Sequence, residues 1–332
     1  MTSSTNNIDN RPTMRAVTQR TFGGPEVLEV SEAPRPVPQP TEVLVRVRAA
    51  GVNPVDWKTR EGTGMAHVLG EPPFVLGWDV AGVVEELGWG VSTLAVGDEV
   101  YGMPWFPRAA GGYGEYVTAP ARQFSRKPAS VTMEQAAAVP LAALTAWQAL
   151  FDTAQVTAGQ RVLITAAAGG VGHFAVQFAR LRGAHVIATA GERNREWLTE
   201  LGAETVIDYT RTRFEDQVGD VDVVIDLVGD HDDTGLRSLR TLRPGGLLVA
   251  VPGGVSPQLQ AAADQQGKRV TAFLVEPDGG ALTRIAAHID AGEVHVEVDQ
   301  VLPLEAAAKA HEAVATGHTR GKVVLQVSDA TA

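Results

Sequence analysis

The chain has 332 residues, of which 44% are hydrophobic and 20% charged, and its formal net charge is −11 at pH 7. This length is more than one hydrophobic core usually contains, and this composition is typical of folded rather than disordered proteins. The negative charge argues against nonspecific binding to nucleic acids or anionic membranes, and no apolar run is long enough to cross a bilayer. The absence of cysteine excludes disulfide bonds, thiol nucleophiles and thiolate metal sites.

The N-terminal segment is polar and lacks the cationic start and apolar centre of a signal peptide, so we expect a disordered tail over 1–13 and a cytoplasmic protein. The next part is rich in Gly, Pro and Val. Apolar or alternating segments of strand-like length, separated by Gly-Asp and Pro-rich turns, lie at 43–48, 80–84 and 114–117. They predict a mostly antiparallel β domain with the character of a barrel.

A change in composition near residue 132 marks the end of this β domain. Thr132 and Gln135 have the spacing of a capping box, and the Ala-rich stretch that follows predicts a helix reaching Ala138. A second helix is predicted over 142–153, and it leads into the next domain.

From residue 161 onwards, short runs of Val, Ile and Leu alternate with helical patterns. We expect strands at 161–165, 184–188, 205–208, 221–228, 247–251 and 270–275, with helices at 171–182, 192–201 and 236–242. This alternation is typical of a parallel sheet covered on both faces. Two further helices and a strand, at 282–291, 304–316 and 321–327, are expected to return to the first domain. The predicted domains are therefore a catalytic domain of 14–137 and 276–332 and a Rossmann domain of 138–275.

A glycine-rich segment connects the first predicted strand of the Rossmann domain to its first helix. The spacing Ala167-x-Gly169-x-x-Gly172 matches the dinucleotide-binding fingerprint, with alanine in the first glycine position. Gly169 allows the backbone to approach a pyrophosphate at the helix N-terminus, and Gly172 allows close packing of helix on strand. Glycine triplets also occur in ordinary tight turns, but the strand, the helix and the βα units that follow favour a cofactor site. The residues assigned to it are Ala168, Gly169, Gly170, Val171 and Gly172.

The end of the second Rossmann strand predicts which dinucleotide binds. NAD sites normally carry Asp or Glu about 20 residues beyond the fingerprint, where the carboxylate accepts the ribose hydroxyls. Here the strand ends near Thr189, and Arg193 and Arg195 follow. Hydroxyl and guanidinium groups suit a 2′-phosphate, so we predict NADP(H) with Thr189 and Arg193 among its ligands. Two alternatives stay open: the arginines form a solvated helix face, or Glu192 is the acid of an NAD site.

Six segments outside the fingerprint, at 14–17, 22–28, 51–58, 97–102, 206–209 and 317–325, carry a family resemblance. From Met14 to Val327 the chain resembles the quinone oxidoreductase and alkenal/enone reductase branch of the medium-chain dehydrogenases/reductases. The resemblance implies an α/β protein in which a Rossmann doubly wound parallel sheet accompanies a GroES-like barrel as catalytic domain. Together with the β-rich character of 270–275, it also implies a homodimer joined through that strand.

Zinc-dependent relatives in this family carry a Cys-x-x-Asp segment and a Gly-His-Glu segment. The matching places in this chain are Asn53 and Gly77-Trp78-Asp79. Asparagine and tryptophan do not serve in a normal zinc site, and the cysteine-rich structural lobe of those relatives has no counterpart between residues 101 and 116. We therefore expect no metal. The chemistry that remains is hydride delivery to an activated carbon–carbon double bond or a quinone.

The resemblance makes Asn53 and Lys58 the candidate catalytic residues, both at the nicotinamide end of the cofactor. Lys58 stands where quinone oxidoreductases have a tyrosine, and it resembles the alkenal/enone reductase branch. We expect it to donate to the ribose or to the enolate oxygen, on which negative charge develops. The alternative is a solvated lysine near a loop. Tyr113, Tyr101 and water are further candidates for the proton donor.

Further cofactor contacts follow from the resemblance and from the rule that ligands lie beyond the carboxyl ends of the strands of an open α/β sheet. They are Thr145 near the nicotinamide, Tyr209 near the 2′-phosphate and adenine, Val228, Val251, Phe273 and Leu274 at strand ends, and Arg320 and Lys322 from the other domain. Each has an alternative as an ordinary packing or surface residue.

Taken together, these features predict an NADPH-dependent, zinc-independent oxidoreductase that reduces a small apolar enone, alkenal or quinone in the cleft between its domains. The sequence indicates no nucleic-acid or membrane partner. An enoyl-thioester reductase is a second possibility, but no basic cluster for the phosphates of a thioester carrier stands out. A third is a protein that binds NADPH as a sensor and no longer turns over.

Overall fold

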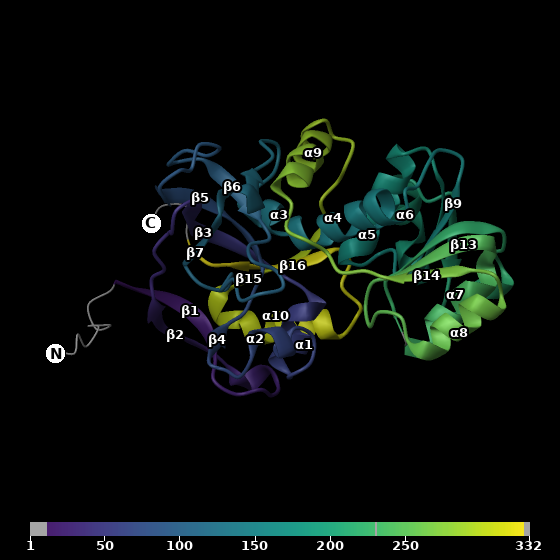
Figure 1. The fold of residues 1–332 in the computed structure, drawn as a ribbon, viewed down its shortest axis with the longest axis horizontal. Helices are drawn as coiled ribbons and strands as arrows, with labels where there is room; N and C mark the ends of the chain where they lie inside the picture. Colours follow the sequence, from purple (N-terminus) through teal and green to yellow (C-terminus); the bar gives the residue numbers. More distant parts are fainter. Residues whose placement is uncertain (1–11, 230, 329–332) are drawn as a thin grey trace.

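The computed structural model describes residues 12–229 and 231–328. They form two lobes: the first third of the chain and its C-terminal segment build one, and the middle of the chain builds the other (Figure 1). The predicted tail over 1–13 lies outside the described residues except for Pro12 and Thr13, and strand β1 already begins at Thr13. Among the described helices, none combines the length and the apolar character needed to cross a membrane.

The lobe built from the middle of the chain contains a six-stranded sheet. Its strands are β9 (Arg161–Ile164), β10 (His185–Ala190), β11 (Thr205–Asp208), β12 (Val221–Asp226), β13 (Leu242–Ala250) and β14 (Arg269–Ala272). All neighbours are parallel, and the order is β11-β10-β9-β12-β13-β14. The chain therefore leaves β9 in one direction and returns to its other side with β12. This reversal between β9 and β12 is the topological switch point of a Rossmann fold.

Helices cover both faces of this sheet, as predicted. Helices α5 (Gly170–Leu181) and α6 (Arg195–Leu201) lie on one face, and α7 (Thr234–Thr241) and α8 (Pro257–Gln265) lie on the other. Successive residues of β9 show why the strands are apolar throughout. Val162 packs in one core with Phe174 of α5, whereas the next residue, Leu163, packs in a second core with Leu239 of α7. Strand β9 is thus buried from two sides, whereas the edge strand β14 has no fully buried residue.

The other lobe contains a seven-stranded sheet in the order β15-β16-β3-β5-β6-β8, with β7 also paired to β3, and a three-stranded sheet in the order β2-β1-β4. Every pair is antiparallel except β15 with β16. The strands are β1 (Thr13–Gln19), β2 (Leu28–Pro34), β3 (Glu42–Val52), β4 (Phe74–Val75), β5 (Asp79–Leu87), β6 (Glu99–Gly102), β7 (Tyr116–Pro120), β8 (Phe124–Arg126), β15 (Val298–Pro303) and β16 (Lys322–Gln326).

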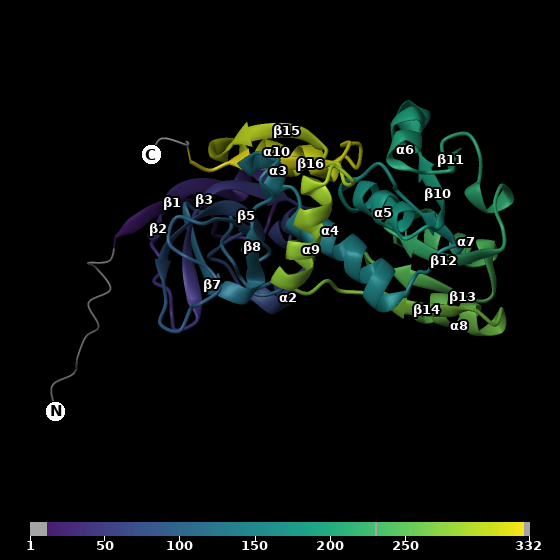
Figure 2. The same ribbon diagram turned by 90° about the horizontal axis from the view of Figure 1, so that it is seen from above.

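The remaining helices connect or cover these sheets: α1 (Pro54–Arg60), α2 (Ala66–Leu69), α3 (Met133–Ala137), α4 (Pro140–Trp147), α9 (Gly279–Asp290) and α10 (Ala307–Ala315). Figure 2 shows α9 between the two lobes. The Tyr101 hydroxyl of β6 donates to the Leu282 carbonyl of α9 at 2.6 Å. Short 3-10 turns occur at Pro25–Val27, Ala121–Gln123, Glu192–Asn194, Phe214–Asp216, His231–Asp233 and Leu304–Ala306.

Several predicted boundaries were wrong. The helix predicted over 142–153 begins at Pro140, and its second half, Gln148–Thr153, is a π-helix. The strand predicted over 114–117 begins at Tyr116, and Gly114 makes only an isolated bridge to Ala16. The helices predicted over 192–201 and 304–316 each start with a 3-10 turn. Strand β15 and helix α8 were not predicted.

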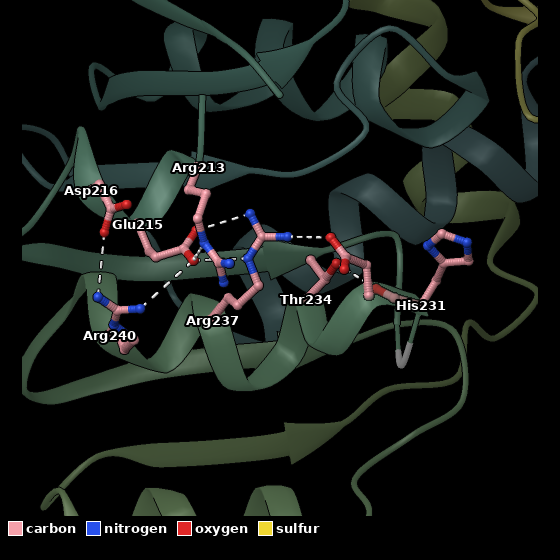
Figure 3. A network of polar contacts seen from close by, with 8 residues as sticks. Arg213, Glu215, Asp216, His231, Thr234, Arg237 and Arg240 are labelled. Carbon is pink, nitrogen blue, oxygen red and sulfur yellow. Dashed lines mark hydrogen bonds and ion pairs between the residues drawn. The ribbon is translucent and has the colours of Figure 1, made fainter. Parts of the chain in front are cut away.

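A buried carboxylate holds together the segments that follow β11 and β12. Glu215 accepts from Arg237 Nε and Nη2, both at 2.9 Å, and from Arg213 Nε at 2.8 Å (Figure 3). Burial alone would raise the pKa of Glu215, but the hydrogen bonds from Arg237 and Arg213 outweigh it and lower the pKa to about 2. Arg240 pairs with Asp216 at 3.3 Å. These arginines are committed to carboxylates, so the network stabilises the fold rather than offering a phosphate site.

Candidate functional site

The glycine loop lies after β9, at the switch point of the sheet. Gly169 is the N-cap of α5, and no side chain caps the N–H groups of the first turn. A Cβ at Gly172 would lie 2.4 Å from the Ala166 carbonyl oxygen and 2.6 Å from Ala167 Cα, whereas a Cβ at Gly169 would meet only that oxygen, at 3.3 Å. Gly172 therefore allows helix and strand to pack closely, as predicted. The uncapped helix N-terminus offers N–H groups and a positive dipole end, which fit a pyrophosphate.

The predicted residues at strand ends lie along the same edge of the sheet. Val228, Val251 and Phe273 follow β12, β13 and β14 directly or within two residues, and each is half-buried. Asp226, which was not predicted as a site residue, organises this edge: its Oδ1 accepts from the Thr165 hydroxyl at 2.9 Å and from the Val228 N–H at 3.0 Å. Leu274 lies beyond β14 and is exposed.

The side chains predicted to bind the 2′-phosphate lie at or after the carboxyl ends of the neighbouring strands β10 and β11. Thr189 is buried, and its hydroxyl oxygen accepts the N–H of Ala166 in the glycine loop at 3.3 Å. Arg193 is exposed and donates to the His318 carbonyl at 2.5 Å. Tyr209 is exposed directly after β11. Near the surface, the Arg193 guanidinium thus bonds a backbone carbonyl rather than a carboxylate, and its charge would suit a phosphate.

Glu192, the alternative acid that would bind the ribose hydroxyls of NAD, is paired with Arg195. Both oxygens of Glu192 accept from Arg195, at 2.8 and 2.9 Å, and Arg195 also donates to the Val206 carbonyl at 2.6 Å. The hydrogen bond from Arg195 lowers the pKa of the exposed Glu192 carboxyl. Because Glu192 and Arg195 satisfy one another, the geometry favours Arg193 over both as the cofactor-recognising residue.

The C-terminal segment reaches across to the glycine loop. The N–H of Gly321 donates to the Ala168 carbonyl at 3.0 Å, and a Cβ at Gly170 would lie 2.9 Å from Lys322 Cδ. Arg320 pairs with Glu297 at 2.8 Å, and its guanidinium lies 4.5 Å from the ring centroid of Trp197 on α6. The structure thus brings Arg320 and Lys322 to the Rossmann lobe, as expected, but both cationic groups already have protein partners.

A buried polar cluster lies beneath the glycine loop. Asn53 is the N-cap of α1, and its Nδ2 donates to Asp79 Oδ2 at 2.8 Å. Lys322 Nζ donates to Asn53 Oδ1 and lies 3.4 Å from Asp79 Oδ2. Burial raises the pKa of Asp79, whereas Lys322 and Asn53 oppose the shift. Burial lowers the pKa of Lys322, and Asp79 opposes that shift. In the sequence, Asp79 was named only as part of the segment that replaces the Gly-His-Glu segment of zinc-dependent relatives. Its position at the centre of this polar cluster was therefore not predicted.

A line of hydrogen bonds extends from this cluster along the buried side of α1. The N–H of Asn53 donates to Asp56 Oδ2 at 2.7 Å, and burial raises the pKa of Asp56 to about 7. Tyr113 Oη lies 3.2 Å from His311 Nε2, and Arg60 Nη1 lies 3.3 Å from His311 Nδ1. Arginine can only donate, so His311 Nδ1 accepts and Nε2 carries the proton. Burial lowers the pKa of His311 to about 3, which keeps this imidazole neutral.

Neither tyrosine considered as a proton donor is free to act. Tyr113 is fully buried with its hydroxyl at His311, and Tyr101 is fully buried and donates to the Leu282 carbonyl. Burial raises the pKa of both phenols. Of the proton donors considered from the sequence, this geometry favours water.

Lys58 and Thr145 lie on helices that border the polar cluster. Thr145 is buried in α4. Lys58 is half-buried in α1, and its ammonium lies 5.6 Å from the ring centroid of Trp57. Lys58 is two residues beyond Asp56, which places it on a different side of α1 from the buried line of hydrogen bonds. The structure therefore separates Lys58 from the Asn53 cluster, although both belong to one helix.

The positions that hold zinc ligands in relatives pack as ordinary side chains here. Trp78 is fully buried, its Nε1 donates to the Arg108 carbonyl at 2.7 Å, and its ring meets Phe106 edge-on at 5.4 Å. Across residues 12–229 and 231–328, no three His, Cys, Asp or Glu side chains group in a way that could hold a metal ion. Asn53 is occupied by Asp79 and Lys322, as described above.

Comparison with known proteins confirms the predicted architecture. Residues 39–129 match the alcohol dehydrogenase GroES-like domain, and residues 201–325 match the zinc-binding dehydrogenase family. The chain is 35% identical over 323 residues to a chloroplastic NADPH-dependent alkenal/one oxidoreductase of Arabidopsis thaliana, covering 94% of this chain and 79% of that protein.

Solved structures give the same result. The quinone oxidoreductase from Coxiella burnetii superposes with a TM-score of 0.91 at 38% identity, over 96% of this chain and 100% of that one. An Escherichia coli quinone oxidoreductase complexed with NADPH superposes with a TM-score of 0.84 at 30% identity, over 94% of this chain and 99% of that one. The predicted combination of a Rossmann sheet and a GroES-like domain is therefore confirmed.

Proposed function

The chain belongs to the quinone oxidoreductase and alkenal/enone reductase branch of the medium-chain dehydrogenases/reductases, and from this premise we propose that it is an NADPH-dependent, zinc-independent reductase of quinones or of the carbon–carbon double bond of enones and alkenals. The observation that carries the proposal is the glycine loop at the switch point, with an uncapped helix N-terminus next to the Asn53 cluster. No zinc ligand set accompanies this site among the described residues.

The chain offers a place for each part of the cofactor. We assign the N–H groups at Gly170, Val171 and Gly172 to the pyrophosphate, and Thr189, Arg193 and Tyr209 to the 2′-phosphate and adenine, because no side chain caps the first turn of α5 and hydroxyl and guanidinium groups suit a phosphate. Thr145, Val228, Val251, Phe273 and Leu274 are the proposed border of the nicotinamide. When bound, NADPH supplies the hydride.

The protein's own contribution to the reaction is binding, orientation and charge stabilisation. Hydride transfer to an enone leaves negative charge on the carbonyl oxygen, which donors held in a dry site stabilise strongly. Asn53 and Lys58 are the proposed donors: the Asn53 NH2 group has a second N–H beside the one that bonds Asp79, and the Lys58 ammonium lies on a different side of α1. Water delivers the final proton, since Tyr113 and Tyr101 are buried and bonded elsewhere.

Arg193→Ala tests the choice of cofactor. We expect the KM for NADPH to rise roughly tenfold to a hundredfold, the usual effect of losing a hydrogen bond to a charged group, while the KM for NADH stays the same. Steady-state kinetics with each nucleotide measure this. Arg195→Ala is the matched control, because Arg195 is bound to Glu192 and Val206, and it should leave the preference intact. An unchanged KM for NADPH in Arg193→Ala would remove Arg193 from the phosphate site.

Lys58→Ala tests the catalytic role of the lysine. Loss of a donor to the developing oxyanion is expected to lower kcat by about 100-fold or more, with little change in NADPH affinity. Lys309→Ala, which removes an exposed lysine on α10, is the control and should have full activity. Full turnover by Lys58→Ala would mean that Lys58 is only a surface lysine.

Two further predictions accompany the proposal. Strand β14 lies at the edge of the six-stranded sheet, where the predicted homodimer would form. The cytoplasmic location is likewise a prediction from the sequence. Light scattering at micromolar concentration distinguishes the dimer from a monomer.

A further inference from the structure

Asp79 connects three elements around the proposed nicotinamide end of the site. Its Oδ1 accepts the N–H of Leu141 at 2.7 Å, at the start of α4, the helix that carries Thr145. Its Oδ2 accepts from Asn53 Nδ2 at 2.8 Å and lies 3.4 Å from Lys322 Nζ. One fully buried carboxylate therefore holds the N-cap of α1, the start of α4 and the first residue of β16.

Lys322 and Asp79 together fix the orientation of the Asn53 carboxamide. An ammonium group only donates, so the Asn53 atom that faces Lys322 must be the oxygen, and the NH2 group must face Asp79. Rotating the carboxamide by half a turn would set donor against donor and acceptor against acceptor. Lys322 also donates to the Val52 carbonyl at 3.1 Å, which anchors the ammonium beside Asn53. Charge thus determines which way this amide points.

The same lysine is in contact with the cofactor loop. A Cβ at Gly170 would lie 2.9 Å from Lys322 Cδ, so the stem of the lysine lies against the first turn of α5. The neighbouring Gly321 N–H donates to the Ala168 carbonyl at 3.0 Å. The side chain that orients Asn53 in one lobe is therefore also packed against the pyrophosphate loop of the other lobe.

We propose that Lys322 and Asp79 are a pair of positioning residues for hydride transfer, which hold the Asn53 carboxamide in one orientation relative to the glycine loop. The inference rests on the proposed function, since it concerns the same reductase site. Lys322 acts through Asn53 rather than by binding the cofactor phosphates, because its buried ammonium is occupied by Asn53, Val52 and Asp79. Asp79 acts by holding Asn53, Lys322 and the start of α4 together.

A purely structural ion pair would behave differently from a positioning pair. Neutral side chains of similar volume can replace a buried ion pair without loss of stability, whereas removing one partner leaves a costly unpaired charge. Asp79→Asn and Lys322→Met are each expected to destabilise the protein. The double variant Asp79→Asn/Lys322→Met removes both charges, so its stability should recover. It still lacks the donor that orients Asn53.

The experiment compares wild type, both single variants and the double variant. Thermal unfolding reports stability, quenching of protein fluorescence reports the Kd for NADPH, and turnover of a quinone or enone accepted by the wild type reports kcat. NADPH deuterated at the transferred position gives the isotope effect on hydride transfer. We expect the double variant to recover its Tm and bind NADPH as wild type does, but to lose roughly 100-fold in kcat, as misplaced reacting groups typically cause. Its isotope effect should rise, because hydride transfer becomes slower than the other steps.

If the double variant regains its Tm and also has the kcat and isotope effect of the wild type, Asp79 and Lys322 only stabilise the fold, and the inference is overturned. A higher Kd for NADPH with an unchanged isotope effect would overturn it too, and would show a direct contact between Lys322 and the cofactor. Arg126→Met, which breaks the ion pair with Asp98 in the same lobe, is the control and should change none of the readouts.

A wild type that reduces no quinone, enone or alkenal would overturn the proposed function and this inference with it. If the wild type turns over, the proposed function stands, and only the comparison of the variants decides the inference. If the double variant does not fold, Lys322→Arg keeps the charge and a donor but enlarges the head group. Because the donor that orients Asn53 is retained, this variant should bind NADPH normally and keep kcat and the isotope effect close to wild type, and a large loss of kcat with a raised isotope effect would contradict the proposal.

Discussion

Replacing Gly172 with valine is expected to abolish NADPH binding and to lower stability. Even the Cβ of the new side chain would lie 2.4 Å from the Ala166 carbonyl oxygen and 2.6 Å from Ala167 Cα, and both are backbone atoms that cannot rotate away. Helix α5 must then move away from β9, at a cost of about 1–3 kcal/mol for overpacking, and the N–H groups at its first turn move with it. Fluorescence titration with NADPH and thermal unfolding measure the two effects.

Gly219→Val is the matched control for this variant. Gly219 lies on the surface before β12, and a Cβ there would meet no atom within 4 Å. We expect unchanged NADPH affinity in the control. Wild-type affinity in Gly172→Val would mean that the glycine loop tolerates a displaced helix and does not determine cofactor binding.

Asp56→Asn is expected to make the protein more stable than wild type as the pH rises. The carboxyl of Asp56 has a pKa of about 7 in the folded protein, against an ordinary value of 3.8, because burial disfavours its charge. Between these two values the folded state binds more protons than the unfolded state, so wild-type stability falls with increasing pH through this window. Asparagine has no such titration, and its side-chain oxygen can still accept the Asn53 N–H.

The expected difference in unfolding free energy between Asp56→Asn and wild type grows by up to ~4 kcal/mol between pH 4 and pH 8. Urea unfolding at a series of pH values measures it. Asp299→Asn removes an exposed carboxylate and should show no comparable trend. A difference that does not vary with pH would mean that Asp56 keeps an ordinary pKa in the folded protein.

The Rossmann half of the fold was predictable because its signals are local. Strand β9, helix α5 and the glycine loop come from one continuous stretch in which an apolar run, a glycine pattern and a helical pattern follow each other. The capping box was equally local: Gln135 N donates to Thr132 Oγ1 at 3.2 Å, as the spacing predicted. Helix α8 was missed because its sequence, PQLQAAADQ, has only one large apolar residue and buries only Leu259 and Ala263.

The buried part of the candidate site was not predictable, because its partners are far apart in the chain. Lys322 and Asn53 are separated by 269 residues, and Arg60 and His311 by 251. The sequence indicated that Lys322 approaches the cofactor, and the structure does place its stem at the glycine loop. The sequence could not indicate that the Lys322 ammonium points inward to Asn53 and Asp79, because that direction depends on how the two lobes meet. For the same reason, nothing in the sequence distinguished the buried Tyr113 from a catalytic tyrosine.

The most direct test of the central claim is the oxidation of NADPH and NADH, followed separately by the absorbance of the reduced nicotinamide. The substrates are quinones, α,β-unsaturated ketones, alkenals and enoyl thioesters, each with and without a metal chelator. We predict turnover of a quinone, enone or alkenal with a clear preference for NADPH, and no loss of rate with the chelator. Tight NADPH binding without oxidation by any of these substrates would contradict the reductase and indicate a cofactor sensor, and activity lost to the chelator would contradict zinc-independent catalysis.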